Sequence, residues 1–167
     1  MDLFPRALRN TFLSSAYTGK RPGDPIQTQQ VNEQQVKLEF LPRTVRLAVE
    51  AAQNKKASAI TVLDLSALGT FTEFFVICTG FSTPQVQAIC TEVEELLYKE
   101  LKREPEHREG QRSTDWALLD FGGFVVHVFS EQARRFYDLE RLWRTVPKLE
   151  IPDTPDAAFS PSRSEAS

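Results

Sequence analysis

Cysteine, histidine and long apolar runs are all scarce in this 167-residue sequence, and each scarcity disfavours a class of protein. Cys78 and Cys90 stand in apolar surroundings without a partner motif, so we expect buried, reduced thiols rather than a disulfide or metal site. No apolar run approaches the roughly 20 residues that span a bilayer, and no secretory signal is evident. We therefore expect a cytoplasmic protein without a membrane segment. An organelle transit peptide is the alternative, and Asp2 disfavours it.

The two histidines offer little for catalysis. His107 stands in a polar segment typical of a surface loop, and His127 lies between Val126 and Val128 in a strand pattern. General acid–base or nucleophilic chemistry needs an oriented base beside a nucleophile or proton acceptor, and the sequence supplies no such set. We therefore expect no enzymatic activity, no metal and no cofactor.

What the sequence does contain is an ordinary globular composition with an uneven charge. Hydrophobic residues make up 41% and charged residues 26%, which suits one domain with a single core. Residues 1–57 carry nine Lys/Arg and five Asp/Glu, whereas residues 58–143 carry eight and fourteen, a net charge of −6. Such a domain is a poor ligand for nucleic acid but suits a basic protein. A solvated acidic surface without a partner is the alternative.

Residue periodicity predicts an α/β fold, with a mixed β-sheet of about five strands flanked by helices. Helices are expected over 42–55, 83–102 and 131–143, and strands over 60–65, 74–79, 116–121 and 124–129, with an edge strand within 104–109. Thr83 is the expected N-cap of the second helix, and Gly122-Gly123 the expected hairpin turn. Because the run 74–78 is apolar on both faces, we expect it in the middle of the sheet.

Composition divides the chain into three parts. Residues 1–40, with a glutamine-rich stretch, are expected to form a flexible extension, and residues 41–144 the α/β domain. Residues 145–167 contain four of the ten prolines and are expected to form a disordered tail. Trp143 ends an apolar helical pattern, so it is expected to pack in the core or against a second subunit.

The hairpin carries the best candidates for binding a partner. Trp116 begins a strand, and an aromatic residue with a polar end is a frequent binding anchor, although core packing is the alternative. Asp120 precedes the turn, where it either stabilises the turn or pairs with a Lys or Arg of a basic partner. His127 is either a structural, hydrogen-bonded histidine or part of an exposed docking surface beside Trp116, Asp120 and Tyr137.

Several sequence blocks occur in the order and spacing of a known family. They are LDLS at 63–66, FFVICTGFS at 74–82, Asp115-Trp116, LLDFG at 118–122, VVHVF at 125–129 and RRFYDLERLW at 134–143. On these blocks the chain resembles the ribosomal silencing factor family (RsfS, also called Iojap). The resemblance implies a non-catalytic, nucleotidyltransferase-like α/β fold and homodimers. It also implies docking on a basic protein at the intersubunit face of the large ribosomal subunit, which blocks small-subunit joining and represses translation in starvation.

By position, the resemblance implies a set of partner-binding residues. Trp116 and Asp120 are placed on the docking surface, and the weaker candidates near it are Glu109, His127, Tyr137 and Glu140. The family usually has Gly-Asp at the hairpin turn, where this chain has Gly122-Gly123. Because that carboxylate is missing, docking here is expected to depend more on Asp120 and Glu109. The family also has Asp-Tyr where this chain has Glu73-Phe74.

Two other functions remain as alternatives. The first is a large-subunit assembly factor, which would use the same surface on immature particles. The second is a divergent nucleotidyltransferase, which would need closely spaced carboxylates for metal ions. The sequence contains no Asp-x-Asp, and Gly80 is followed by Phe81 before Ser82, so the expected motif is missing.

Overall fold

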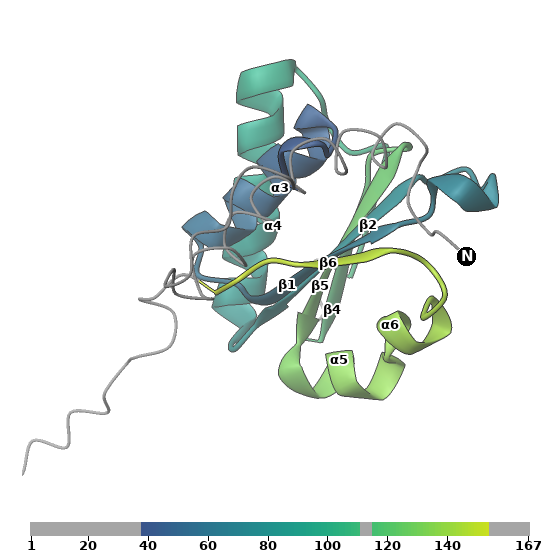
Figure 1. The fold of residues 1–167 in the computed structure, drawn as a ribbon. Coiled ribbons are helices and arrows are strands. Elements are labelled where there is room, and N and C mark those ends of the chain that lie inside the picture. The colour runs from purple at the N-terminus through teal and green to yellow at the C-terminus, as the bar shows by residue number, and fades with distance from the viewer. Residues whose placement is uncertain (1–37, 111–114, 154–167) are drawn as a thin grey trace, which may run out of the picture.

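A six-stranded mixed β-sheet organises residues 38–110 and 115–153, the parts of the chain that this computed structural model describes (Figure 1). The strands are β1 (Ser58–Asp64), β2 (Phe74–Gly80), β3 (His107–Glu109), β4 (Trp116–Asp120), β5 (Phe124–Ser130) and β6 (Lys148–Glu150). They lie in the order β3-β4-β5-β2-β1-β6, with β2 and β5 parallel and the other neighbours antiparallel. The predicted α/β fold is confirmed, and the sheet has one strand more than expected.

Strand β2 lies between β5 and β1, as its apolar sequence predicted. Only Phe75 among its seven residues is not fully buried. Val76 and Cys78 face one core cluster, while Ile77 belongs to a second cluster on the other face of the sheet. A strand covered on both faces cannot show the alternation of a half-exposed strand, which explains its continuous apolar run.

Helices α3 (Arg43–Asn54) and α4 (Thr83–Leu101) cover one face of the sheet (Figure 1). Their buried side chains pack with alternate residues of the strands, among them Val62, Val76 and Val126. A short 3-10 turn, η1 (Ser66–Leu68), begins the connection from β1 to β2. This face therefore holds the larger of the two cores.

The N-cap of α4 is Ser82, so the prediction of Thr83 was wrong by one residue. Ser82 has an extended backbone, and its hydroxyl accepts a hydrogen bond from the Gln85 N–H at 3.3 Å. Thr83 is already helical, and Pro84 follows it in the first turn, where the missing N–H leaves no bond unmade.

Two short helices, α5 (Glu131–Tyr137) and α6 (Leu139–Leu142), lie on the opposite face of the sheet, where the sequence predicted one helix. Asp138 breaks the helix because its backbone is left-handed, with φ 45°. Two apolar residues on either side of this break lie at the surface: Phe136 is 80% exposed and Leu142 is 73% exposed. Trp143 packs partly buried against the second core cluster, which consists of Leu63, Leu65, Ile77, Phe129, Ala133 and Val146.

The sixth strand, β6, lies within the segment that was predicted to be a disordered tail, so that prediction was wrong for residues 145–153. Strand β6 pairs antiparallel with β1, with Leu149 opposite Val62. The Ile151 N–H donates to the Ile60 carbonyl at 2.8 Å, and Ile151 is buried. The proline-rich composition concealed a segment that adds backbone hydrogen bonds to an open sheet edge. Residues 154–167, and residues 1–37 of the predicted extension, lie outside the described residues.

Candidate protein-docking face

On the face of the sheet opposite α3 and α4, strands β3 and β4 carry side chains that no helix covers fully. Strand β4 alternates: Ala117 and Leu119 are buried against α3 and α4, whereas Trp116, Leu118 and Asp120 are half-exposed on the opposite face. The strand register sets Glu109 of β3 opposite Leu118. Because paired residues of neighbouring strands share a face, these side chains form one surface. We call Glu109, Trp116, Leu118 and Asp120 the docking face.

Trp116 is held rigidly although its ring is half-exposed. Its Nε1–H donates to His127 Nδ1 at 3.2 Å, and its ring stacks on Phe129 with 5.1 Å between centroids. The Tyr137 ring lies 4.7 Å from it on another side. A large aromatic side chain whose orientation is already fixed loses little conformational entropy on binding. Trp116 therefore has the properties of a binding anchor.

His127 is buried, so the interpretation of it as an exposed docking residue was wrong. It is 4% exposed, in contact with the Phe75 ring at 4.8 Å between centroids. Burial lowers the pKa of His127 to about 4, so the ring is neutral at neutral pH. Accepting the bond from Trp116 requires an unprotonated Nδ1, which places the proton on Nε2. Within the described residues, Nε2 has no hydrogen-bond partner. His127 thus positions Trp116 and leaves almost none of its own side chain at the surface.

The acidic residues of the docking face are placed differently. Asp120 Oδ1 accepts a hydrogen bond from the Gly122 N–H at 2.8 Å, which stabilises the hairpin turn. Its Oδ2 lies 3.7 Å from Nδ1 of the exposed His107. Asp120 therefore stabilises the turn with one oxygen and leaves the other at the surface. Glu109 is exposed on the edge strand β3.

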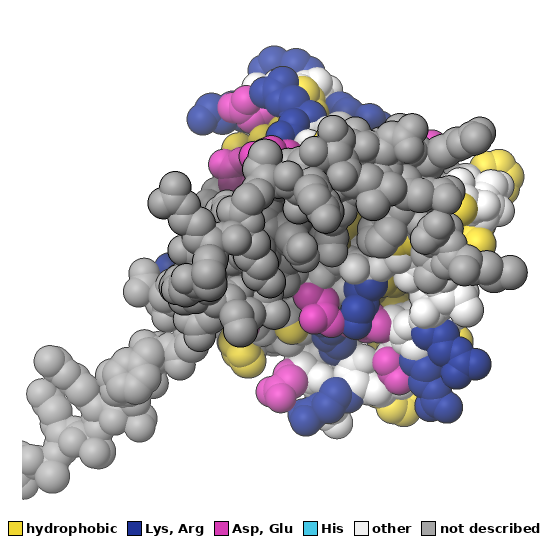
Figure 2. Space-filling model, in the orientation of Figure 1, with side chains coloured by type: hydrophobic (Ala, Val, Ile, Leu, Met, Phe, Trp, Pro, Cys, Tyr) yellow, Lys and Arg dark blue, Asp and Glu magenta, His cyan; other side chains and the backbone are white. Residues whose placement is uncertain are grey.

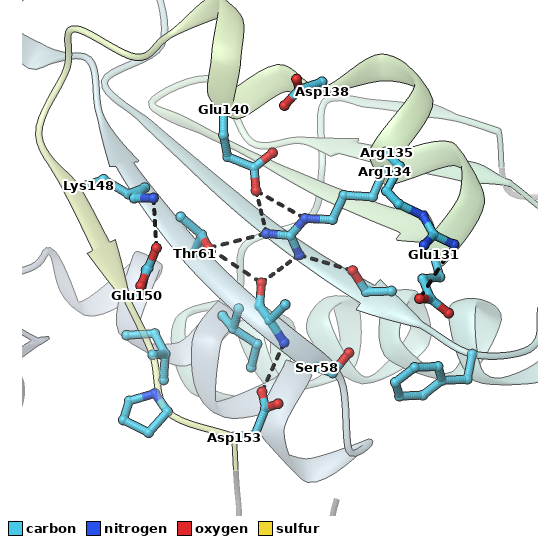
Figure 3. A pocket seen from close by; sticks show the side chains of 16 residues that line it. Ser58, Thr61, Glu131, Arg134, Arg135, Asp138, Glu140, Lys148, Glu150 and Asp153 are labelled. Atoms are coloured by element: carbon cyan, nitrogen blue, oxygen red, sulfur yellow. Dashed lines mark hydrogen bonds and ion pairs between the residues drawn. The ribbon is translucent and has the colours of Figure 1, made fainter. Parts of the chain in front are cut away.

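Glu140 does not join the docking face. It is half-buried and pairs with Arg134 through Oε1, which accepts from the guanidinium at Nε, 3.0 Å away, and at Nη2. Figure 3 shows Arg134 reaching from α5 across the strands toward Glu140 and Thr61. The other acceptors of this guanidinium are the Ala59 carbonyl and the Thr79 hydroxyl.

All five N–H groups of Arg134 are therefore used within the fold. Through these bonds, Arg134 fastens α5 and α6 to β1 and β2. The hollow around this ion pair has a volume of about 970 Å³ and is lined by residues of β1, β6 and α5.

Sequence reasoning missed two residues of this region. Leu118 has the same strand parity as Trp116 and Asp120, so the alternation in β4 was the signal that could have found it. Phe75 was expected to be covered, but it is half-exposed and its ring contacts both His127 and Trp143, the latter at 5.8 Å. Trp143 therefore packs within its own chain.

Both cysteines are buried and free. Burial raises the pKa of the Cys78 and Cys90 thiols to about 12, so neither is a thiolate at neutral pH. Among residues 38–110 and 115–153, no three His, Cys, Asp or Glu side chains converge as metal ligands would. In the described part of the chain, no helix has the length and apolar character needed to cross a membrane.

Comparison with known proteins places the chain among translation regulators. The sequence model of a family described as "Ribosomal silencing factor during starvation" matches residues 39–167. Ribosomal silencing factor RsfS of Halalkalibacterium halodurans is 38% identical over 110 residues, which cover 64% of this chain and 91% of that protein. The chloroplastic protein Iojap of Zea mays is 37% identical over 114 residues, covering 68% of this chain and 49% of that protein.

Two solved structures are similar over the same region. A crystal structure from Bacillus halodurans has a TM-score of 0.56 at 38% identity and covers 64% of this chain and 96% of that chain. A second, from Chromobacterium violaceum, has a TM-score of 0.58 at 34% identity and covers 67% of this chain and 93% of that chain. Since the family model spans most of the sequence, the chain belongs to the ribosomal silencing factor (RsfS) family.

Proposed function

We propose that this ribosomal silencing factor binds a basic protein on the intersubunit face of the large ribosomal subunit through its docking face. Occupying that surface sterically blocks the small subunit and represses translation. The observation that supports this most directly is Trp116, a half-exposed ring fixed by His127 on the same face of the sheet as the carboxylates of Asp120 and Glu109. Interfaces are anchored by such aromatic side chains and oriented by complementary charge.

The proposed activity is competition for a surface, so it needs no reacting group. Its strength depends on how tightly the docking face holds its partner. Truncating a central aromatic anchor costs about 2 kcal/mol or more, which is roughly a 30-fold loss of affinity. Asp120 adds electrostatic attraction to a basic partner, and this attraction is expected to weaken as salt is raised.

Homodimerisation and a cytoplasmic location both stay predictions. The relatives include bacterial factors and chloroplastic proteins. Light scattering coupled to size exclusion measures the mass of the particle directly. A mass of one chain, 19.0 kDa, across the working concentrations would contradict the dimer.

Sedimentation of purified ribosomal subunits tests the proposed function. Small and large subunits are mixed at a magnesium concentration that promotes joining, with and without this protein. The expected result is loss of the joined peak, with the protein travelling on the large subunit. A protein that binds large subunits while joining proceeds would favour the assembly function instead. A protein that pellets with neither subunit would refute the proposal.

A matched pair of variants locates the docking face. Trp116→Ala combined with Asp120→Lys removes the anchor and reverses a charge on the proposed surface. Tyr98→Ala combined with Glu95→Lys makes the same two changes at exposed positions of α4, on the opposite side of the sheet. We expect the first pair to abolish co-sedimentation and the second to preserve it. Equal binding by both would remove Trp116 and Asp120 from the interface.

A further inference from the structure

An exposed group of basic and apolar side chains lies on α5, α6 and the turn that follows, beside the docking face. We call it the arginine patch, and it consists of Arg135, Phe136, Arg141, Leu142 and Arg144, which line a hollow together with Tyr137 and Asp138. Figure 2 shows Lys and Arg side chains gathered over the end of the molecule where Figure 1 places α6, with hydrophobic surface next to them. This grouping is unexpected in a domain whose residues 58–143 have a net charge of −6.

The charges of the arginine patch are open to a partner. Arg135 has only a 3.5 Å contact with Glu131, and both side chains are more than half exposed, so this ion pair contributes little. Within the described residues, Arg141 and Arg144 have no ion-pair partner. Arg134 differs from them because its guanidinium is already saturated by hydrogen bonds inside the fold.

The apolar members of the patch lie at the surface on either side of the left-handed Asp138. Phe136, near the end of α5, is 80% exposed, and Leu142, at the end of α6, is 73% exposed. A flat aromatic ring beside planar guanidinium groups is the combination on which unpaired bases stack while phosphates pair with arginine.

The arginine patch is continuous with the docking face. The Tyr137 ring lies 4.7 Å from Trp116 and 5.2 Å from Phe136, measured between centroids. When a partner contacts Trp116, the molecules that surround that partner therefore lie next to the arginine patch. If that partner is a basic ribosomal protein, its surroundings are ribosomal RNA.

We propose that the arginine patch binds ribosomal RNA, through phosphates and an unpaired base, next to the protein that the docking face holds. The inference rests on the proposed function, because it uses the position of the docking face on the large subunit. It divides the molecule into an acidic surface for protein and a basic surface for RNA. The overall acidic charge predicted poor nucleic-acid binding, and the patch is a local basic surface that departs from this charge.

The salt dependence of binding to large subunits tests the proposal. Each RNA phosphate neutralised contributes a slope of about 0.7 to 0.9 in log affinity against log salt. Replacing Arg135, Arg141 and Arg144 by glutamine should therefore lower the slope by about 2 to 3. Each doubling of salt would then cost the wild type roughly fivefold more affinity than the variant. An unchanged slope would overturn the proposal.

A control variant changes net charge by the same amount elsewhere. Arg46→Gln, Lys99→Gln and Lys102→Gln alter exposed residues of α3, of α4 and of the C-cap of α4, and this control should keep the wild-type slope. Binding to the isolated basic ribosomal protein should be equal for the wild type and the patch variant, since the docking face is intact. If the wild type fails to bind large subunits at all, the proposed function fails and not only the RNA contact.

Photo-crosslinking identifies what occupies the patch. A p-azidophenylalanine residue at position 136 is irradiated in the complex with large subunits. An adduct whose mass is reduced by ribonuclease supports RNA at the patch. An adduct that resists ribonuclease and is lost only with protease would show that a protein occupies the patch, which overturns the inference.

Discussion

Replacing Arg134 by methionine is expected to destabilise the domain severely. Its guanidinium donates to Glu140, to the hydroxyls of Thr61 and Thr79 and to the Ala59 carbonyl. Methionine fills similar space but donates nothing. The change would leave the Glu140 carboxylate half-buried without its counter-charge, and it would detach α5 and α6 from the strands beneath them.

The expected loss follows from the burial of the pair. The Arg134 side chain is 14% exposed and the Glu140 side chain 22% exposed. Removing one partner of a buried ion pair costs about 3 to 5 kcal/mol, and the residual exposure favours the lower end, about 3 kcal/mol. For a domain of this size, that corresponds to a fall of roughly 10 °C in the melting temperature. Adding Glu140→Met to the Arg134 variant should recover part of the loss, because no unpaired carboxylate then remains.

Urea unfolding followed by circular dichroism measures the change. Arg135→Met is the matched control, since it makes the same substitution one position along α5 at a side chain that is 74% exposed. We expect the control to cost less than about 0.5 kcal/mol. If the two single variants unfold at the same urea concentration, Arg134 does not hold the helices to the sheet and the reasoning is refuted.

Three further predictions concern the hairpin. Burial lowers the pKa of His127 from 6.5 to about 4, so the stability it contributes is complete above pH 6.5 and is lost as the pH falls toward 4. Across that window, the wild type should lose about 3 kcal/mol more unfolding free energy than His127→Gln, and parallel pH profiles would contradict this. Gly122 has φ 79°, so Gly122→Ala should cost about 1 to 2 kcal/mol in urea unfolding, while Gly123→Ala, with open space around it, should cost little. Trp116→Ala should lower affinity for large subunits at least about 30-fold relative to Tyr98→Ala, measured by pelleting.

Much of the fold could be predicted because its signals are local. The continuous apolar run of β2 indicated a central strand, and the glycine pair indicated the hairpin turn. The break at Asp138 could not be predicted, because apolar spacing continues through it. The hydrogen bonds of Arg134 that hold α5 and α6 in place reach strands far away in the sequence. Strand β6 was missed for the same reason. Its three residues are stabilised by pairing with β1, which lies about 90 residues earlier in the chain.

The candidate site could be predicted in part. Trp116 and Asp120 lie on one face as expected, because strand parity is readable from the sequence. The burial of His127 depends on rings supplied by β2 and β4 as well as by its own strand β5, which no local pattern reveals. Glu140 was assigned by position along a helix that is in fact broken, so its side chain meets Arg134 instead of the docking face.

The short β6 strand also bears on how the protein avoids self-association. Without β6, the backbone N–H and C=O groups of β1 beside Val62 and Leu63 would be unpaired, and they could form β-sheet hydrogen bonds with a second molecule. Strand β6 occupies that edge and replaces it with one only three residues long, bearing the charged Lys148 and Glu150. A chain shortened to end at residue 144 would keep the docking face, but it would lose Val146 and Ile151 from the two cores, and the uncovered edge of β1 would make it prone to aggregate. For this reason, residues 148–151 protect the edge of β1 against aggregation.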